Sequence, residues 1–94
     1  MILYISYNND SLELVTQLNS ILQDVEIISY NEDVKKERKK AFGLKGNYGA
    51  KESPFSVLYK EDKPIKAFYT EVRECTLDNI INYLNTLNNE NTCN

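Results

Sequence analysis

The sequence contains no histidine and no tryptophan, and it has only two cysteines, two prolines and three glycines. The absence of histidine removes the usual general base near neutral pH and the commonest metal ligand. A structural zinc site needs four cysteine or histidine ligands, so it is excluded. Cys75 and Cys93 can form at most one bridge, which excludes a disulfide-rich secreted scaffold and favours a reducing, cytoplasmic setting. We expect no metal and no cofactor.

Long apolar runs are also missing from this chain of 94 residues, so we expect no membrane span. The apolar start at residues 1–7 lacks a basic segment and a cleavage site, and we do not expect it to be a signal peptide. The length predicts one domain over residues 1–87, followed by a polar and disordered tail at 88–94. Asparagine, lysine, isoleucine and tyrosine are abundant. This usage is typical of AT-rich coding sequences and indicates a phage or low-GC bacterial source. A phage origin would place the protein in the host cytoplasm or the virion.

The charge is distributed unevenly along the chain. The net charge is -3, yet residues 33–51 carry a net charge of +5 and the remainder carries -8. One interpretation of this basic segment is a solvated helix face. The other is a surface for an anionic partner, with nucleic acid binding through residues 35–45. Only Phe42 and Tyr48 supply aromatic rings nearby, so nucleic acid binding is the weaker alternative.

Hydrophobic patterning predicts an α/β domain with the order β-α-β-α-β-β-α. The strands are expected at residues 2–7, 25–30, 55–59 and 65–69, and the helices at 10–23, 33–42 and 76–87. The strand at 2–7 is apolar at consecutive positions, so we expect it in the centre of a four-stranded mixed sheet with helices on both faces. The strands at 2–7 and 25–30 should be parallel, and the last two strands should form an antiparallel hairpin. Helices 10–23 and 76–87 should share one face of this sheet.

Several residues are expected to begin or end these helices. Asp10 can cap the first helix, with Glu13 as its capping-box partner, and Thr76 can cap the last one. Gly43 is a plausible stop for the second helix. The glycines at 43, 46 and 49 do not match a dinucleotide-binding or phosphate-loop motif, so we expect only a flexible loop there.

Residues 41–46 and 53–59 resemble the thioredoxin stretch that runs from the second helix, through a cis-proline, into the third strand. Six further residues, 47–52, separate the two parts here. In element order, residues 1–87 are similar to thioredoxin and glutaredoxin domains. The resemblance implies a thioredoxin-like fold, a cis peptide bond at Ser53-Pro54, and a Ser53 backbone that is offered to an extended partner segment.

Thioredoxins and glutaredoxins carry their nucleophilic cysteine at the turn between the first strand and the first helix. The matching positions hold Asn8, Asn9, Asp10 and Ser11, and none of them is a thiol. Thiol-disulfide exchange at this place is therefore excluded, and we do not expect an enzyme. The loops 8–11, 52–54 and 73–76 should converge at one end of the sheet. The binding residues predicted there are Asn8, Asn9, Asp10, Ser53, Pro54 and Arg73.

Cys75 precedes the last helix, near the place where glutaredoxins bind the acidic end of glutathione. A helix N-terminus can lower the pKa of a thiol, while Glu74 and Asp78 act in the opposite direction. We therefore expect a catalytically inactive thioredoxin-like module that binds a protein, as a phage or viral structural or accessory component. The alternative is an atypical redox or glutathione-binding protein that uses Cys75.

Overall fold

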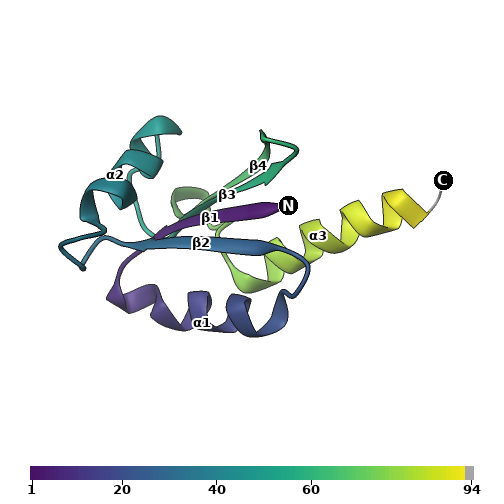
Figure 1. Cartoon of the computed structure of the whole chain (residues 1–94), viewed down its shortest axis with the longest axis horizontal. Coiled ribbons are helices and arrows are strands. Elements are labelled where there is room, and N and C mark those ends of the chain that lie inside the picture. Colours follow the sequence, from purple (N-terminus) through teal and green to yellow (C-terminus); the bar gives the residue numbers. More distant parts are fainter. Residues whose placement is uncertain (93–94) are drawn as a thin grey trace.

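The computed structural model describes residues 1–92, and the side chains of residues 1–88. Two short 3-10 turns, η1 (Asn9–Ser11) and η2 (Thr70–Val72), join the larger elements. The strands and helices, shown in Figure 1, are β1 (Ile2–Tyr7), α1 (Leu12–Ile21), β2 (Glu26–Asn31), α2 (Arg38–Asn47), β3 (Phe55–Lys60), β4 (Lys63–Tyr69) and α3 (Leu77–Thr92).

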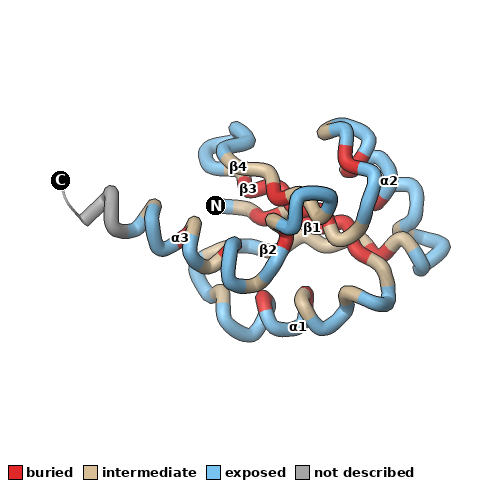
Figure 2. Tube along the Cα trace, turned by 180° about the vertical axis from the view of Figure 1, so that it is seen from behind, coloured by how far each residue is buried: buried red, intermediate tan, exposed pale blue. Residues whose placement is uncertain are grey.

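The four strands form one mixed sheet in the order β2-β1-β3-β4. β1 pairs with β2 in parallel, whereas β3 is antiparallel to both β1 and β4. The central position of β1, the parallel first pair and the β3-β4 hairpin are thus confirmed. Figure 2 shows that the buried positions concentrate in the central strands, which need cover on both faces.

Each face of the sheet has its own hydrophobic cluster. Leu3 and Ile5 of β1 pack with α1 and α3 on one face, as the sequence predicts. On the other face Phe55 and Val57 pack beside α2, and Ser6 Oγ donates a hydrogen bond of 2.9 Å to the carbonyl of Ala41. This bond attaches α2 to the central strand, and Figure 1 shows α2 on the side of the sheet opposite α1 and α3.

The first helix begins later than expected. Asp10 lies inside η1, and α1 follows with Ser11 at its N-cap position. No capping hydrogen bond comes from the side chain of Ser11, whose Oγ instead donates to Asn8 Oδ1 at 3.1 Å. The predicted capping role of Asp10 is therefore wrong, because this residue lies inside a 3-10 turn and Ser11 occupies the N-cap position of α1.

The second helix is displaced by about one and a half turns relative to the prediction of 33–42. Turns occupy residues 32–37, where Asp33 N donates to Asn31 Oδ1 and Asn31 N donates to Glu37 Oε1. These side-chain bonds compete with helical pairing and delay the start of α2 to Arg38. Gly43 lies inside the helix rather than ending it, and the positive φ of 70° belongs to Gly49.

The last helix begins as predicted and continues further. Thr76 Oγ1 accepts a hydrogen bond of 3.2 Å from Asn79 N, which confirms the expected cap. α3 extends to Thr92, so most of the segment predicted as a disordered tail has a helical backbone. Cys93 lies outside the described residues.

None of the helices described over residues 1–92 combines the length and the apolar character needed to cross a membrane.

Candidate functional site

The candidate site lies at the end of the sheet beyond the carboxyl ends of the parallel strands β1 and β2. We call this region the polar end and define it as residues 8–11, 31–33, 51–54 and 70–74, together with Lys45 of α2. Residues 8–11 follow β1 and residues 31–33 end or follow β2, whereas residues 51–54 precede β3. Because β3 runs antiparallel to β1, its first residues lie at this same end. Ligands of open α/β sheets commonly bind in such a position.

Asn9 is fixed by residues from the end of β2. Asn31 Nδ2 donates a hydrogen bond of 2.9 Å to Asn9 Oδ1, and Asn9 N donates to Asp33 Oδ2 at 2.8 Å. Asn31 is buried and also accepts from Asp33 N. The turn between β1 and α1 is therefore held by amide and carboxylate groups.

Lys45 forms the charged centre of the polar end, although it comes from α2. Its side chain is only 6% exposed, and its ammonium group lies 3.2 Å from Glu32 Oε1. It also donates to Ser53 Oγ at 3.0 Å, and Ser53 Oγ in turn donates to Glu32 Oε1. The Phe42 ring covers the ammonium group, with 4.7 Å between Nζ and the ring centroid. Lysine, glutamate and serine thus form a closed, mutually neutralised cluster.

Ser53 is half-buried and its side chain is fully engaged by this cluster, but its backbone is not. No hydrogen bond joins the backbone N–H or C=O of Ser53 to another residue in the described part of the chain. The following peptide bond, Ser53-Pro54, is cis, as the resemblance implied. The carbonyl of Pro54 accepts a hydrogen bond from Thr70 Oγ1.

The loop before Ser53 is attached to η2 by one carboxylate. Glu71 accepts hydrogen bonds from the backbone N–H groups of Lys51, at 2.9 Å, and Glu52, at 3.4 Å. The N–H of Lys51 lowers the pKa of this carboxyl below its ordinary value. The loop that presents Ser53 is therefore fixed on both sides, by Glu71 and by Lys45.

The other predicted binding residues lie outside the cluster of Lys45, Glu32 and Ser53. Arg73 is exposed, has a φ of 60°, and donates its backbone N–H to Thr70 O at 2.9 Å. Asp10 is exposed on η1, and Asn8 is half-buried beside Ser11. Within the described residues no hydrogen bond or ion pair links Arg73 or Asp10 to Ser53.

Cys75 lies in the core on the face covered by α1 and α3. It is 6% exposed, and its Sγ lies 3.4 Å from Ser56 Oγ of β3. Burial raises the pKa of the Cys75 thiol to about 11, although the hydrogen bond with Ser56 acts in the opposite direction. The helix N-terminus that could have activated this thiol is therefore outweighed by desolvation.

The basic segment is divided by the structure. Lys45 is neutralised by Glu32, and Arg38 Nε donates to the carbonyl of Glu32 at 2.9 Å. The ammonium group of Lys40 lies 5.7 Å from the centroid of the Tyr30 ring. Lys36 and Lys39 are exposed on the surface. Lys45 of the basic segment therefore belongs to the polar end, and only the other basic residues of the segment form a solvated basic surface.

Sequence reasoning missed Glu32 and Lys45 as members of the site. Lys45 stands among five other basic residues between 35 and 45, and no local signal separates it from them. Its contact with Glu32 spans 13 positions, and the contact of Glu32 with Ser53 spans 21. Only the packing of α2 across the sheet brings these residues together.

Comparison with known proteins gives no relative of this chain. No protein-family model, no curated protein and no solved structure matches it.

Proposed function

We propose that the chain is a catalytically inactive thioredoxin-like module that binds an extended segment of a protein partner at the polar end. The observation that carries this proposal is the state of Ser53. Its side chain is held by Glu32 and Lys45, while its backbone N–H and C=O have no partner among the described residues. A preorganised backbone with free hydrogen-bonding groups can pair with an extended segment, as in strand addition.

The architecture supports the thioredoxin-like part of the proposal. The strand order β2-β1-β3-β4, with α1 and α3 on one face and α2 on the other, agrees with what the resemblance implies. Asn8, Asn9 and Asp10 stand where thioredoxins have their reactive thiol, so binding is the function that the site retains.

The two other interpretations have less support. A redox or glutathione-binding role needs an accessible thiolate, and Cys75 is buried with a raised pKa. Nucleic acid binding through residues 35–45 would have to proceed without Lys45, whose charge is paired with Glu32.

The proposal can be tested with linear peptides selected from a random display library against the folded protein. Affinities of the selected peptides are then compared between the natural chain and Ser53→Trp, whose bulk should obstruct the polar end. We expect a loss of about tenfold or more, which corresponds to about 1.4 kcal/mol. Ser53→Ala keeps the backbone groups and should bind more tightly than Ser53→Trp.

The matched control is the double variant Lys36→Glu with Lys39→Glu, because both side chains are exposed on the basic surface. This variant should change mainly the salt dependence of binding. Retained affinity in Ser53→Trp together with lost affinity in the charge-reversal variant would move the binding surface to α2. Failure to select any peptide would contradict recognition of extended segments.

A further inference from the structure

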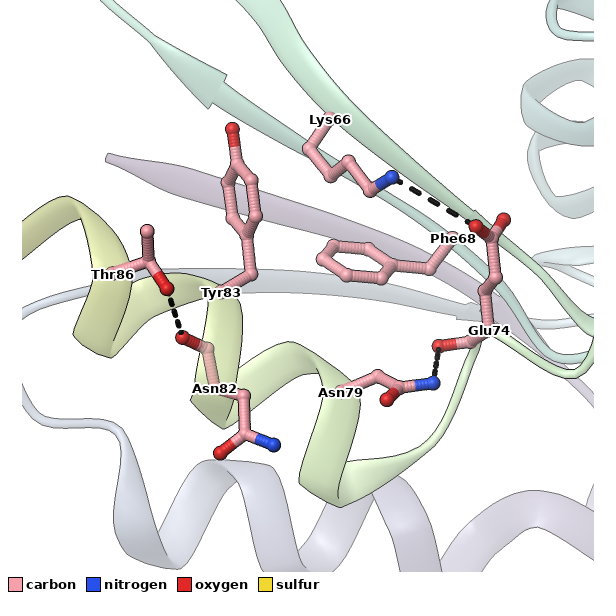
Figure 3. Close-up of a pocket in the computed structure, with 7 residues that line it drawn as sticks. All are labelled: Lys66, Phe68, Glu74, Asn79, Asn82, Tyr83 and Thr86. Atoms are coloured by element: carbon pink, nitrogen blue, oxygen red, sulfur yellow. Dashed lines mark hydrogen bonds and ion pairs between the residues drawn. The ribbon is translucent and has the colours of Figure 1, made fainter.

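A second region that could bind a ligand lies between β4 and α3, on the face of the sheet that α2 does not cover. It is a cavity of about 310 Å3, at the lower end of the range for small-molecule sites. Figure 3 shows the side chains that line it. They are Lys66, Phe68, Glu74, Asn79, Asn82, Tyr83 and Thr86.

Tyr83 supplies the accessible aromatic ring of the cavity wall, because Phe68 is only 2% exposed and belongs to the core. The ring of Phe68 from β4 meets the ring of Tyr83 from α3 edge to face, with 6.0 Å between the centroids and 82° between the planes. In Figure 3 the Phe68 ring lies between Tyr83 on one side and the pair Lys66 and Glu74 on the other. A ligand ring entering the cavity would therefore contact Tyr83, which Phe68 supports from the core.

One cation and one anion lie beside these rings. Lys66 Nζ and Glu74 Oε2 are 3.8 Å apart, near the limit for an ion pair, and both side chains are 38% exposed. Such a pair is weak and opens at little cost. Lys66 Nζ also lies 5.9 Å from the centroid of the Phe68 ring, which places this charge beside the aromatic pair.

We propose that this cavity binds a small zwitterion with an aromatic ring, in the chemical class of the aromatic amino acids. A ligand with a carboxylate alone would meet Lys66 favourably but would be repelled by Glu74. A ligand with an ammonium group alone would meet Glu74 favourably but would be repelled by Lys66. A zwitterion can satisfy both charges by separating the weak pair, while its ring packs against the partly exposed ring of Tyr83.

The test is a titration of the isotope-labelled protein with L-phenylalanine, followed through the backbone amide resonances. We expect saturable shifts at Lys66, Phe68 and Tyr83, with a Kd on the order of 1 mM for a ligand of this size. Hydrocinnamate lacks the ammonium group, phenethylamine lacks the carboxylate, and alanine lacks the ring. Each should bind about tenfold more weakly than L-phenylalanine, because it leaves one part of the cavity unsatisfied.

Variants separate this cavity from other surfaces. Lys66→Met and Glu74→Gln remove only the half-exposed pair, so they should fold, and each should lower the affinity for L-phenylalanine about tenfold. Lys63→Met, an exposed position on the same strand outside the cavity, should leave the affinity unchanged. The proposal is overturned by absent shifts, by shifts that map elsewhere, by equal binding of hydrocinnamate, or by unchanged affinity in Lys66→Met.

Discussion

Replacing Lys45 by methionine tests the charged cluster at the polar end. Methionine preserves most of the apolar stem of the side chain but removes the ammonium group that Glu32 and Ser53 contact. The side chain of Glu32 is only 17% exposed, so its carboxylate would remain largely buried without its cation. Such a loss is far more severe than the loss of a surface charge.

Breaking a buried ion pair from one side destabilises a protein by about 3–5 kcal/mol. Because Glu32 keeps some access to water and the hydrogen bond from Ser53, we expect the lower end of that range, about 3 kcal/mol. This corresponds to a fall of about 2 M in the midpoint of urea unfolding for a domain of this size. The double variant Lys45→Met with Glu32→Gln leaves no buried unpaired charge. It should therefore be less destabilised than the sum of the two single variants by at least about 1 kcal/mol.

The measurement is urea unfolding followed by far-ultraviolet circular dichroism, on the natural chain, both single variants and the double variant. Lys39→Met is the matched control, because Lys39 is an exposed lysine on the same helix, and its free energy of unfolding should change by no more than about 0.5 kcal/mol. Equal midpoints for Lys45→Met and Lys39→Met would refute the burial and pairing argued for Lys45. Additive effects of the two substitutions in the double variant would refute their coupling.

Three further predictions concern the thiol, the second helix and catalysis. In a Cys93→Ser variant, Cys75 should react with Ellman's reagent at pH 8 about a hundredfold more slowly than an exposed thiol, because its pKa is raised to about 11, and unfolding in guanidinium should abolish the difference. Because folding keeps this thiol protonated, its contribution to the free energy of unfolding should be fully present below pH 9. This contribution should be lost as the pH rises from about 9 towards about 11. The loss should be smaller in Cys75→Ala. Gly43→Ala should stabilise the protein by about 1 kcal/mol in urea unfolding, because a Cβ at this position inside α2 meets nothing within 4 Å. Gly49→Ala should destabilise it by about 1 kcal/mol, because the φ of Gly49 is 70°. The opposite signs would contradict the observed end of α2. Reduction of insulin by dithiothreitol should proceed no faster with the protein than without it, and clear turnover would contradict the absence of an accessible nucleophilic thiol.

The sequence by itself determined which segments become strands and which face the first and last helices bury. Consecutive apolar residues from Ile2 to Ile5 favour a central strand, because only a position covered on both faces shields them all from water. The apolar spacing that includes Ile80 and Leu84 likewise predicts the buried side of α3. Thr76 could be identified as a cap because its hydroxyl acts on a residue three positions away.

Competition between local and longer-range contacts made the helix boundaries difficult to predict from the sequence. Residues 33–37 contain good helix formers, but the hydrogen bonds that Asn31 Oδ1 accepts from Asp33 N and Glu37 Oε1 accepts from Asn31 N hold them in turns and move α2 towards the C-terminus. Gly43 is a typical helix stop by propensity, yet it remains inside α2, where Ala41 and Lys45 are buried by the helix. A weak intrinsic preference is readily overridden by packing.

The members of the polar end were decided only by the tertiary structure. Asn9 and Ser53 could be predicted from the positions of their loops at the end of a sheet. The pairing of Lys45 with Glu32, and the contact of both with Ser53, depends on how α2 crosses the sheet. Electrostatic attraction depends on distance in space and on exclusion of water, and neither quantity is encoded in the spacing of residues along the chain. The burial of Cys75 has the same origin, because a thiol placed by sequence at a helix start becomes inert once β3 and the helices on that face enclose it.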